Sequence, residues 1–246
     1  MKYIHILCFV VVLMLTFNCF SQLNGKATYS VISNINTEDI KDQTARELME
    51  GVNKEISKLE FTLTFNTHGS LFEVNKILEA DNANPYHRKI ALASCKGNDV
   101  WHYSKEEDLR ICKLNMFDQE FTIISKPDEL RWTMEKESKM TGKHKSYKAT
   151  TIIKVVGSKG LSERQVIAWY TPEIPVNYGP LGFQNLPGLI MELHMDKVIY
   201  QLKSVKFSED EPKIDLPLLK NSISQEEFYA IADKRIARFR KDQGRE

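Results

Sequence analysis

The sequence is poor in glycine, proline and cysteine, and neither sign of charge dominates it. Its 246 residues include only 11 Gly and 8 Pro, too few for a fibre or a low-complexity linker. The 34 Lys and Arg nearly balance the 33 Asp and Glu, which argues against a nucleic-acid-binding protein. A hydrophobic fraction of 42% and a charged fraction of 27% are typical of a globular chain and exclude a disordered one.

The sequence also lacks the short motifs that mark common active sites. It contains no HExxH pair for a metal, no serine in a G-x-S-x-G turn and no glycine loop that could hold a phosphate. His102 beside three acidic residues is the nearest approach to a cluster, and a solvated acidic turn explains it. We therefore predict no catalytic residue, no metal site and no cofactor, and we do not expect an enzyme.

The N-terminal segment has the pattern of an export signal. Lys2 precedes an apolar run that ends at Cys19-Phe20-Ser21, and small residues at the −3 and −1 positions favour cleavage before Gln22. An uncleaved membrane anchor or a lipoprotein signal with Cys19 lipidated are the alternatives. We expect a cleaved signal peptide at 1–21, one domain at 22–246, and a location in the periplasm or at the outer membrane. Removing Lys2 would leave equal numbers of basic and acidic side chains.

Only two cysteines would remain after cleavage. In an exported protein Cys95 and Cys112 could form a disulfide, worth roughly 3 kcal/mol in the chain-entropy model. A strand is expected between them, and two strands separated by a third lie too far apart to bridge. A disulfide and two buried free thiols therefore remain equal alternatives.

Short segments rich in β-branched and aromatic residues predict a sheet. Phe61, Leu63 and Phe65 alternate with threonines, the pattern of a half-buried strand. Because few helices separate these segments, the sheet is expected to be antiparallel. The predicted strands are 25–33, 61–65, 71–78, 90–95, 100–103, 109–114, 120–124, 130–134, 147–155, 165–171, 189–194 and 198–207.

Two segments have helical periodicity. Apolar residues recur every three or four positions from Ala45 to Leu59, after a cap at Asn36 or Thr37. At the C-terminus, Ser224 and Glu227 form a capping box in front of a helix that ends in a basic cluster. The fold class is therefore α+β, mainly β with accessory helices.

The most unusual stretch is 165–194, where four prolines and three glycines crowd into positions 172–188. Proline and glycine restrict the chain to a defined path, and Pro187-Gly188 suits a type II turn. Because its apolar side chains cannot remain in water, the loop must pack on the sheet. It is either a lid over an apolar cavity or a plug that fills the core. The candidate ligand-binding or lid residues are Trp169, Tyr170, Tyr178, Phe183, Leu186, Pro187, Gly188 and Leu189.

This stretch resembles the signature of the GLPGLI family of exported Bacteroidetes proteins. The resemblance is carried by AWYTPEIP at 168–175, Gly179-Pro180 and NLPGLI at 185–190. It extends to GKATY at 25–29, FTLTFN at 61–66 and KSYKAT at 145–150. The first glycine of the family's hexapeptide is Asn185 here, which tolerates a positive φ. Ser146 stands where many members have cysteine, so no thiol role is carried over.

The resemblance implies a mostly β fold similar to the curved half-barrels of lipoprotein carriers, an extracytoplasmic location and no known activity. Two functions are expected from it. The first is a non-enzymatic binding module for a lipid, an acyl chain or a hydrophobic peptide under the 172–190 loop. The second is a structural or assembly partner of outer-membrane machinery that uses strand edges or the basic helix 224–241. No nucleic-acid partner is expected.

Overall fold

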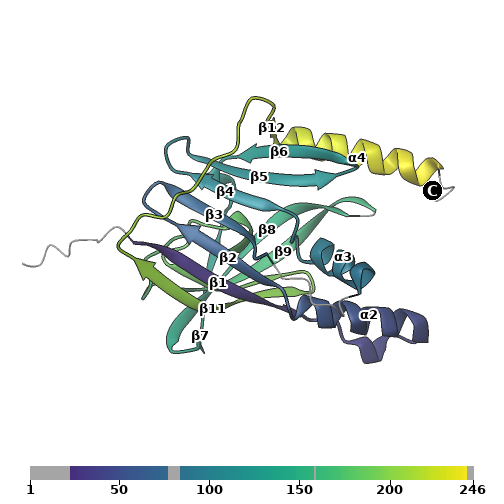
Figure 1. Ribbon diagram of the computed structural model, residues 1–246, viewed down its shortest axis with the longest axis horizontal. Helices are drawn as coiled ribbons and strands as arrows, with labels where there is room; N and C mark the ends of the chain where they lie inside the picture. The colour runs from purple at the N-terminus through teal and green to yellow at the C-terminus, as the bar shows by residue number, and fades with distance from the viewer. Residues whose placement is uncertain (1–22, 77–83, 158, 243–246) are drawn as a thin grey trace, which may run out of the picture.

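One large sheet organises the chain, and it is antiparallel except for the short edge strand β12, which pairs with β6 in parallel (Figure 1). The computed structural model describes residues 23–76, 84–157 and 159–242, so the predicted signal peptide 1–21 lies outside the described residues. The strand order is β12-β6-β5-β4-β3-β2-β1-β11-β10-β9-β8-β7, and the sheet is curved but not closed. The mainly β, α+β class is confirmed. The strands are β1 (Asn24–Ser33), β2 (Glu60–Phe65), β3 (Gly69–Val74), β4 (Val100–Ser104), β5 (Leu109–Met116), β6 (Gln119–Ser125), β7 (Thr133–Thr141), β8 (His144–Gly157), β9 (Gly160–Thr171), β10 (Leu189–Met195), β11 (Val198–Ser208) and β12 (Ile223–Ser224).

At the centre of the sheet, β1 from the N-terminal part of the chain pairs with β11, which is more than 160 residues further along. β1 pairs with β2 on one side and with β11 on the other, in a register that places Asn24 opposite Ser208. Two buried tyrosines lie at this centre, and their hydroxyls donate to backbone carbonyls: Tyr29 to Ile190 at 2.8 Å and Tyr200 to Cys95 at 2.6 Å. The pairing connects the wing β2–β6 with the wing β7–β10.

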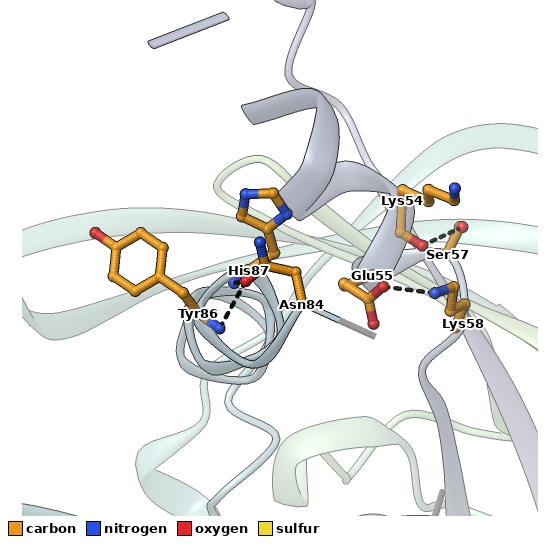
Figure 2. A network of polar contacts seen from close by, with 7 residues as sticks. All are labelled: Lys54, Glu55, Ser57, Lys58, Asn84, Tyr86 and His87. Carbon is orange, nitrogen blue, oxygen red and sulfur yellow. Dashed lines mark hydrogen bonds and ion pairs between the residues drawn. The ribbon is translucent and has the colours of Figure 1, made fainter. Parts of the chain in front are cut away.

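Two helices close one end of the main core. α2 (Gln43–Ile56) and α3 (Pro85–Ser94) contact each other and lie side by side in Figure 1. Val52 and Ile56 of α2 and Ala91 of α3 are buried in the core. Figure 2 shows the polar ends of this pair: the Asn84 side chain accepts from Tyr86 N at the start of α3, and Glu55 pairs with Lys58 after α2. A 3₁₀ turn, η1 (Thr37–Asp39), precedes α2.

The third helix covers the other wing. α4 (Gln225–Asp242) buries Phe228, Ala232 and Ile236; the first two pack in one cluster with Phe121 and Ile123 of β6, and the helix also contacts β8 and β9. In Figure 1 it lies along β6. The predicted capping box is formed: Glu227 N donates to Ser224 Oγ at 3.1 Å, and Ser224 N donates to Glu227 at 2.8 Å. None of the helices within the described part of the chain is both long and apolar enough to cross a membrane.

Three sequence predictions of helices and strands are wrong. The strand predicted at 130–134 is instead β7 (Thr133–Thr141), which begins three residues later and extends seven residues further. Residues 90–95 form the end of α3, not a strand, because Asn84 caps a helix that has Pro85 in its first turn. The helix predicted from Asn36 starts later, because Asp42 caps α2 through Ala45 N at 2.7 Å. In both helices the capping residue was not recognised from the sequence: it is Asn84 for α3 and Asp42 for α2.

The loop 172–188 fills the main core. Its alternate apolar side chains are buried with the sheet residues, and Asn177 O and Tyr178 O accept from Asn185 N and Ile190 N. Asn185 has φ 70°, so asparagine keeps the left-handed position expected of the family's glycine. Gly188 has φ 145°, and a Cβ there would lie 2.0 Å from the Thr171 carbonyl oxygen. The buried apolar residues of the loop are Ile174, Val176, Tyr178, Leu181, Phe183, Leu186 and Leu189.

The turn at the end of the loop differs from the one predicted. Gly188 N donates to Leu186 O at 2.8 Å across Pro187, while Leu189 N donates to Ile174 O at 2.9 Å. The three-residue bond across Pro187 is therefore a γ-type turn rather than a type II turn. The Leu189 N–H is therefore free to bond to Ile174 in the first part of the loop, and β10 begins at this residue.

Removing a buried side chain of the loop should destabilise the whole protein. Leu186 is 1% exposed, and Leu186→Ala is expected to lower the free energy of unfolding by about 2–5 kcal/mol. The matched control is Leu218→Ala, since Leu218 is 91% exposed. Urea denaturation followed by circular dichroism measures both variants. Equal midpoints for Leu186→Ala and Leu218→Ala would contradict the assignment of the loop as part of the core.

Candidate functional site

A cavity of about 430 Å³ lies between the two wings of the curved sheet. One wall is the face of β4–β6 that carries Trp101, Cys112 and Ile123, and the opposite wall is the β8 segment 152–156. Most of the lining side chains are apolar. Cavities of 300–1,000 Å³ with apolar walls and few polar groups are typical of small-molecule sites.

Helix α4 forms the third side of the cavity. Phe228 and Tyr229 line it, and the Tyr229 hydroxyl donates to the Lys154 carbonyl of β8 at 2.8 Å. Phe228 packs against Phe121 of β6 with ring centroids 5.3 Å apart. The helix therefore contacts both walls and spans the opening between them.

The tip of the 172–188 loop forms the fourth side. In the 3₁₀ turn η3 (Pro180–Gly182), Leu181 and Gly182 both have positive φ, 55° and 68°. A Cβ at Gly182 would lie 2.8 Å from the Trp101 ring, so glycine allows the turn to approach β4. A left-handed leucine costs roughly 1–2 kcal/mol, and here it places Leu181 in the wall beside Phe183.

A buried cation faces this mainly apolar space. Arg110 of β5 lines the cavity and is only 6% exposed. Its Nε donates to Gly182 O at 2.9 Å, Nη1 donates to Ser125 Oγ at 3.4 Å, and the guanidinium lies 5.6 Å from the centroid of the Trp101 ring. Burial lowers the pKa of Arg110 to about 10, so the group stays charged at neutral pH. Among the described residues, no carboxylate forms an ion pair with it.

The Trp101 and Cys112 side chains of the same wall carry polar groups that are buried within it. The indole Nε1 of Trp101 is buried and has no hydrogen-bond partner among the described residues. Burial raises the pKa of the neighbouring Cys112 thiol well above its usual value; Asp99 adds to this effect, and Arg110 opposes it. The thiol is therefore protonated and unreactive at neutral pH.

Asp99 is the half-buried acidic group of the cavity. Burial raises the pKa of its carboxyl to about 6, and Lys96 partly offsets that rise. Arg131, Lys154 and Glu129 also border the cavity, but their side chains are exposed.

The residues predicted from the 165–194 stretch are not gathered in one place. Phe183 lines the cavity, and its ring lies 5.8 Å from that of Trp132. Trp169 lies on the other face of the sheet, with Lys139 Nζ 4.4 Å from its ring centroid and paired with Glu192 at 2.5 Å. The others are distributed between core and surface: Tyr170, Tyr178, Leu186, Gly188 and Leu189 are buried, and Pro187 is exposed.

The cavity's most distinctive residue was not predicted from the sequence. Arg110 stands in the same alternation as Cys112, Leu114 and Met116, all of which face the cavity from β5. The signal that could have identified Arg110 is an arginine at a position of the strand where the alternation calls for an apolar residue. An unpaired charge on a buried face is costly, so such a residue calls for an explanation.

The two cysteines are free, so the structure contains no disulfide between Cys95 and Cys112. Cys95 ends α3 in the main core, whereas Cys112 belongs to β5 and the second apolar cluster. The prediction that Cys95 lies in a strand was wrong. The two thiols are nevertheless kept apart by the fold, because they belong to different apolar clusters. Within the described residues, no group of His, Cys, Asp and Glu side chains is arranged to hold a metal.

Comparison with known proteins gives a short family match. Residues 158–192 match the model of a family described as "Protein of unknown function (Porph_ging)". This segment contains the motif at 168–190 that carries the resemblance described above. No curated protein matches the chain.

Among solved structures, the chain is similar to PNGF-II in two crystal forms, C2 and P21. The identity is 12% in both, with TM-scores of 0.47 and 0.48. The matches cover 87% and 85% of this chain but 33% of PNGF-II, so the chain spans about one third of that protein's length.

The raised pKa of Asp99 predicts a pH-dependent effect on stability. Because the folded pKa of about 6 exceeds that of an unfolded aspartate, the ionised carboxyl destabilises the fold above pH 6, and the penalty disappears as pH falls toward 4. Asp99→Asn should therefore raise the free energy of unfolding at pH 7 by about 1–3 kcal/mol relative to the unchanged protein.

Denaturation at pH 4, 5, 6 and 7 measures this difference, which should shrink steadily toward pH 4. Glu106→Gln, on the exposed turn between β4 and β5, is the control and should show no such trend. A stability gain for Asp99→Asn that is the same at all four pH values would contradict the assignment.

Proposed function

We propose that the protein is an exported, non-enzymatic binding module that holds an apolar or amphipathic small molecule between the wings of its sheet. The observation that supports this most directly is the cavity of about 430 Å³ bounded by β4–β6, β8, α4 and the η3 turn. The export signal predicted at 1–21 supports a site of action in the periplasm or at the outer membrane.

The boundary of the cavity supports binding rather than a packing defect. Its walls come from four separate parts of the chain, and one of them includes a left-handed leucine at 181. A protein that only needed a dry core would gain stability by filling such a space, since each unfilled methylene volume costs free energy. An unfilled cavity beside the buried guanidinium of Arg110 supports a ligand-binding role better than a purely structural one.

We propose a position for the ligand that differs from the one expected under the whole 172–190 loop. Most of the 172–188 loop is core, and only its tip at Leu181 and Phe183 reaches the cavity. The loop therefore combines the two predicted roles: its flanks fill the main core and its tip forms one wall. The ligand would lie beside this tip, against β5 and α4.

The alternative role as an assembly partner has less support. The basic helix expected to make the contact is part of the fold, since α4 contributes Phe228 and Ala232 to the second core cluster. Its basic end is exposed, and Arg235 donates to Gln119 at 2.8 Å. A contact surface there would consist only of the last turns of the helix.

Filling the cavity should abolish ligand binding without a matching loss of stability. Cys112 is in the centre of the β5 wall, so Cys112→Trp places an indole in the space, whereas Cys112→Ala leaves it open. With the neutral apolar dye N-phenyl-1-naphthylamine, we expect saturable fluorescence enhancement for the unchanged protein and for Cys112→Ala. Cys112→Trp should bind at least tenfold more weakly.

Native mass spectrometry of the exported protein gives an independent measurement, with a co-purified apolar molecule as the expected result. Thermal unfolding of both variants controls for loss of the fold. Equal dye binding by the Trp and Ala variants, both folded, would refute the cavity as the binding site.

A further inference from the structure

We propose that the cavity binds a single-chain amphiphile with a carboxylate head group, such as a fatty acid, with the carboxylate at Arg110 and the hydrocarbon chain along β5. This inference rests on the proposed function and specifies its ligand class. The inference follows from the buried charge of Arg110, from the guanidinium nitrogen that has no partner among the described residues, and from the apolar wall of β5.

The charge of the site is a buried cation without a carboxylate partner. Arg110 is 6% exposed, and its neighbours are a carbonyl, a hydroxyl and an aromatic ring, which solvate the guanidinium but do not neutralise it. Burying an unpaired charge is costly, and the cost is recovered when an anion with good hydrogen-bond geometry joins it. The same cavity supplies the space for that anion.

The remaining donors match a planar acceptor. Nε and Nη1 are used by Gly182 and Ser125, and Nη2 has no hydrogen-bond partner among the described residues. A guanidinium presents its donors in a planar fork that fits a carboxylate.

The wall beside Arg110 is an apolar row. Arg110, Cys112, Leu114 and Met116 are successive residues on one face of β5, and all four line the cavity. At ~3.4 Å per residue the row from Arg110 to Met116 is about 20 Å long. A charged group at one end of an extended apolar row is complementary to a head group followed by a straight hydrocarbon chain.

The head group should carry one negative charge. Arg110 is the only buried cation among the described residues that line the cavity, and half-buried Asp99 lies on the same wall. The carboxylate whose charge acts on Arg110 is Glu129, which also borders the cavity, so a phosphate would bring up to two further negative charges to a site with one guanidinium. A carboxylate balances the single cation, which is why it is preferred to a phosphate.

Three ligands with the same twelve-carbon chain test the head group: dodecanoate, 1-dodecanol and dodecyl phosphate. Each is titrated against the complex with N-phenyl-1-naphthylamine, and displacement of the dye is measured by fluorescence. For the unchanged protein we expect dodecanoate to displace the dye at a concentration at least tenfold lower than either of the others, because a hydrogen bond to a charged group is among the stronger polar contacts.

Variants at two arginines test the residue. Arg110→Met should weaken dodecanoate at least tenfold and leave 1-dodecanol within about threefold, while Arg110→Lys should retain part of the preference because it keeps the charge but not the fork. Arg131→Met is the matched control: Arg131 also borders the cavity but is exposed, and its loss should leave the preference unchanged.

The outcomes separate this inference from the proposed function. Dye and dodecanol binding with no preference for dodecanoate would overturn the inference and leave an apolar binding module in place. Tighter binding of dodecyl phosphate would overturn the carboxylate assignment. No binding of the dye or of any of the three ligands would refute the proposed function itself. If Arg110→Met does not fold, the comparison of the three ligands on the unchanged protein and on Arg110→Lys still decides.

Discussion

The pairing of β1 with β11 is the constraint on which the rest of the structure depends. It brings Asn24 opposite Ser208 and so joins two wings that are each built from neighbouring hairpins. Such a long-range pairing is entropically expensive, and it is stabilised by the aromatic core around Tyr29 and Tyr200. Because the joined sheet curves, β4–β6 and β8 come to face each other across a space that neither wing encloses alone.

The buried guanidinium of Arg110 links this architecture to function. Its strongest contact is the Gly182 carbonyl, which is presented by two consecutive left-handed residues at the tip of the 172–188 loop. The flanks of that loop are held elsewhere: Asn185 Nδ2 donates to Pro127 O at 2.8 Å, and Trp132 Nε1 donates to Gln184 O at 2.8 Å. Packing and hydrogen bonds of the rest of the loop therefore offset the strain at Leu181. The turn places the Gly182 carbonyl beside the Arg110 guanidinium, whose Nη2 has no partner among the described residues.

Local signals in the sequence were sufficient for most elements of secondary structure. The alternation in β2, the short apolar segments of β4 to β6 and the capping box before α4 all form as their residues indicate. The exceptions are the start of α2, the bounds of β7, and α3, where an Asn-Pro helix start was overlooked in favour of the apolar segment that follows it. Burial of the loop 172–188 was also one of the two expected outcomes, because its apolar side chains require cover.

The sequence by itself determined a mainly β chain, the capping box of α4 and a loop that must be buried, since propensity, periodicity and hydrophobicity act over a few residues. Only the tertiary structure decided what the loop meets. Trp169 and Tyr170 are adjacent in the chain yet lie on opposite faces of the sheet, because neighbouring side chains of a strand alternate. Arg110 and Gly182 are 72 residues apart in the chain and become partners because the sheet curves. The sequence could mark Arg110 as an unusual charge at an apolar position of a strand, but a cavity formed between distant strands has no local signature, so only the folded chain shows what the guanidinium faces.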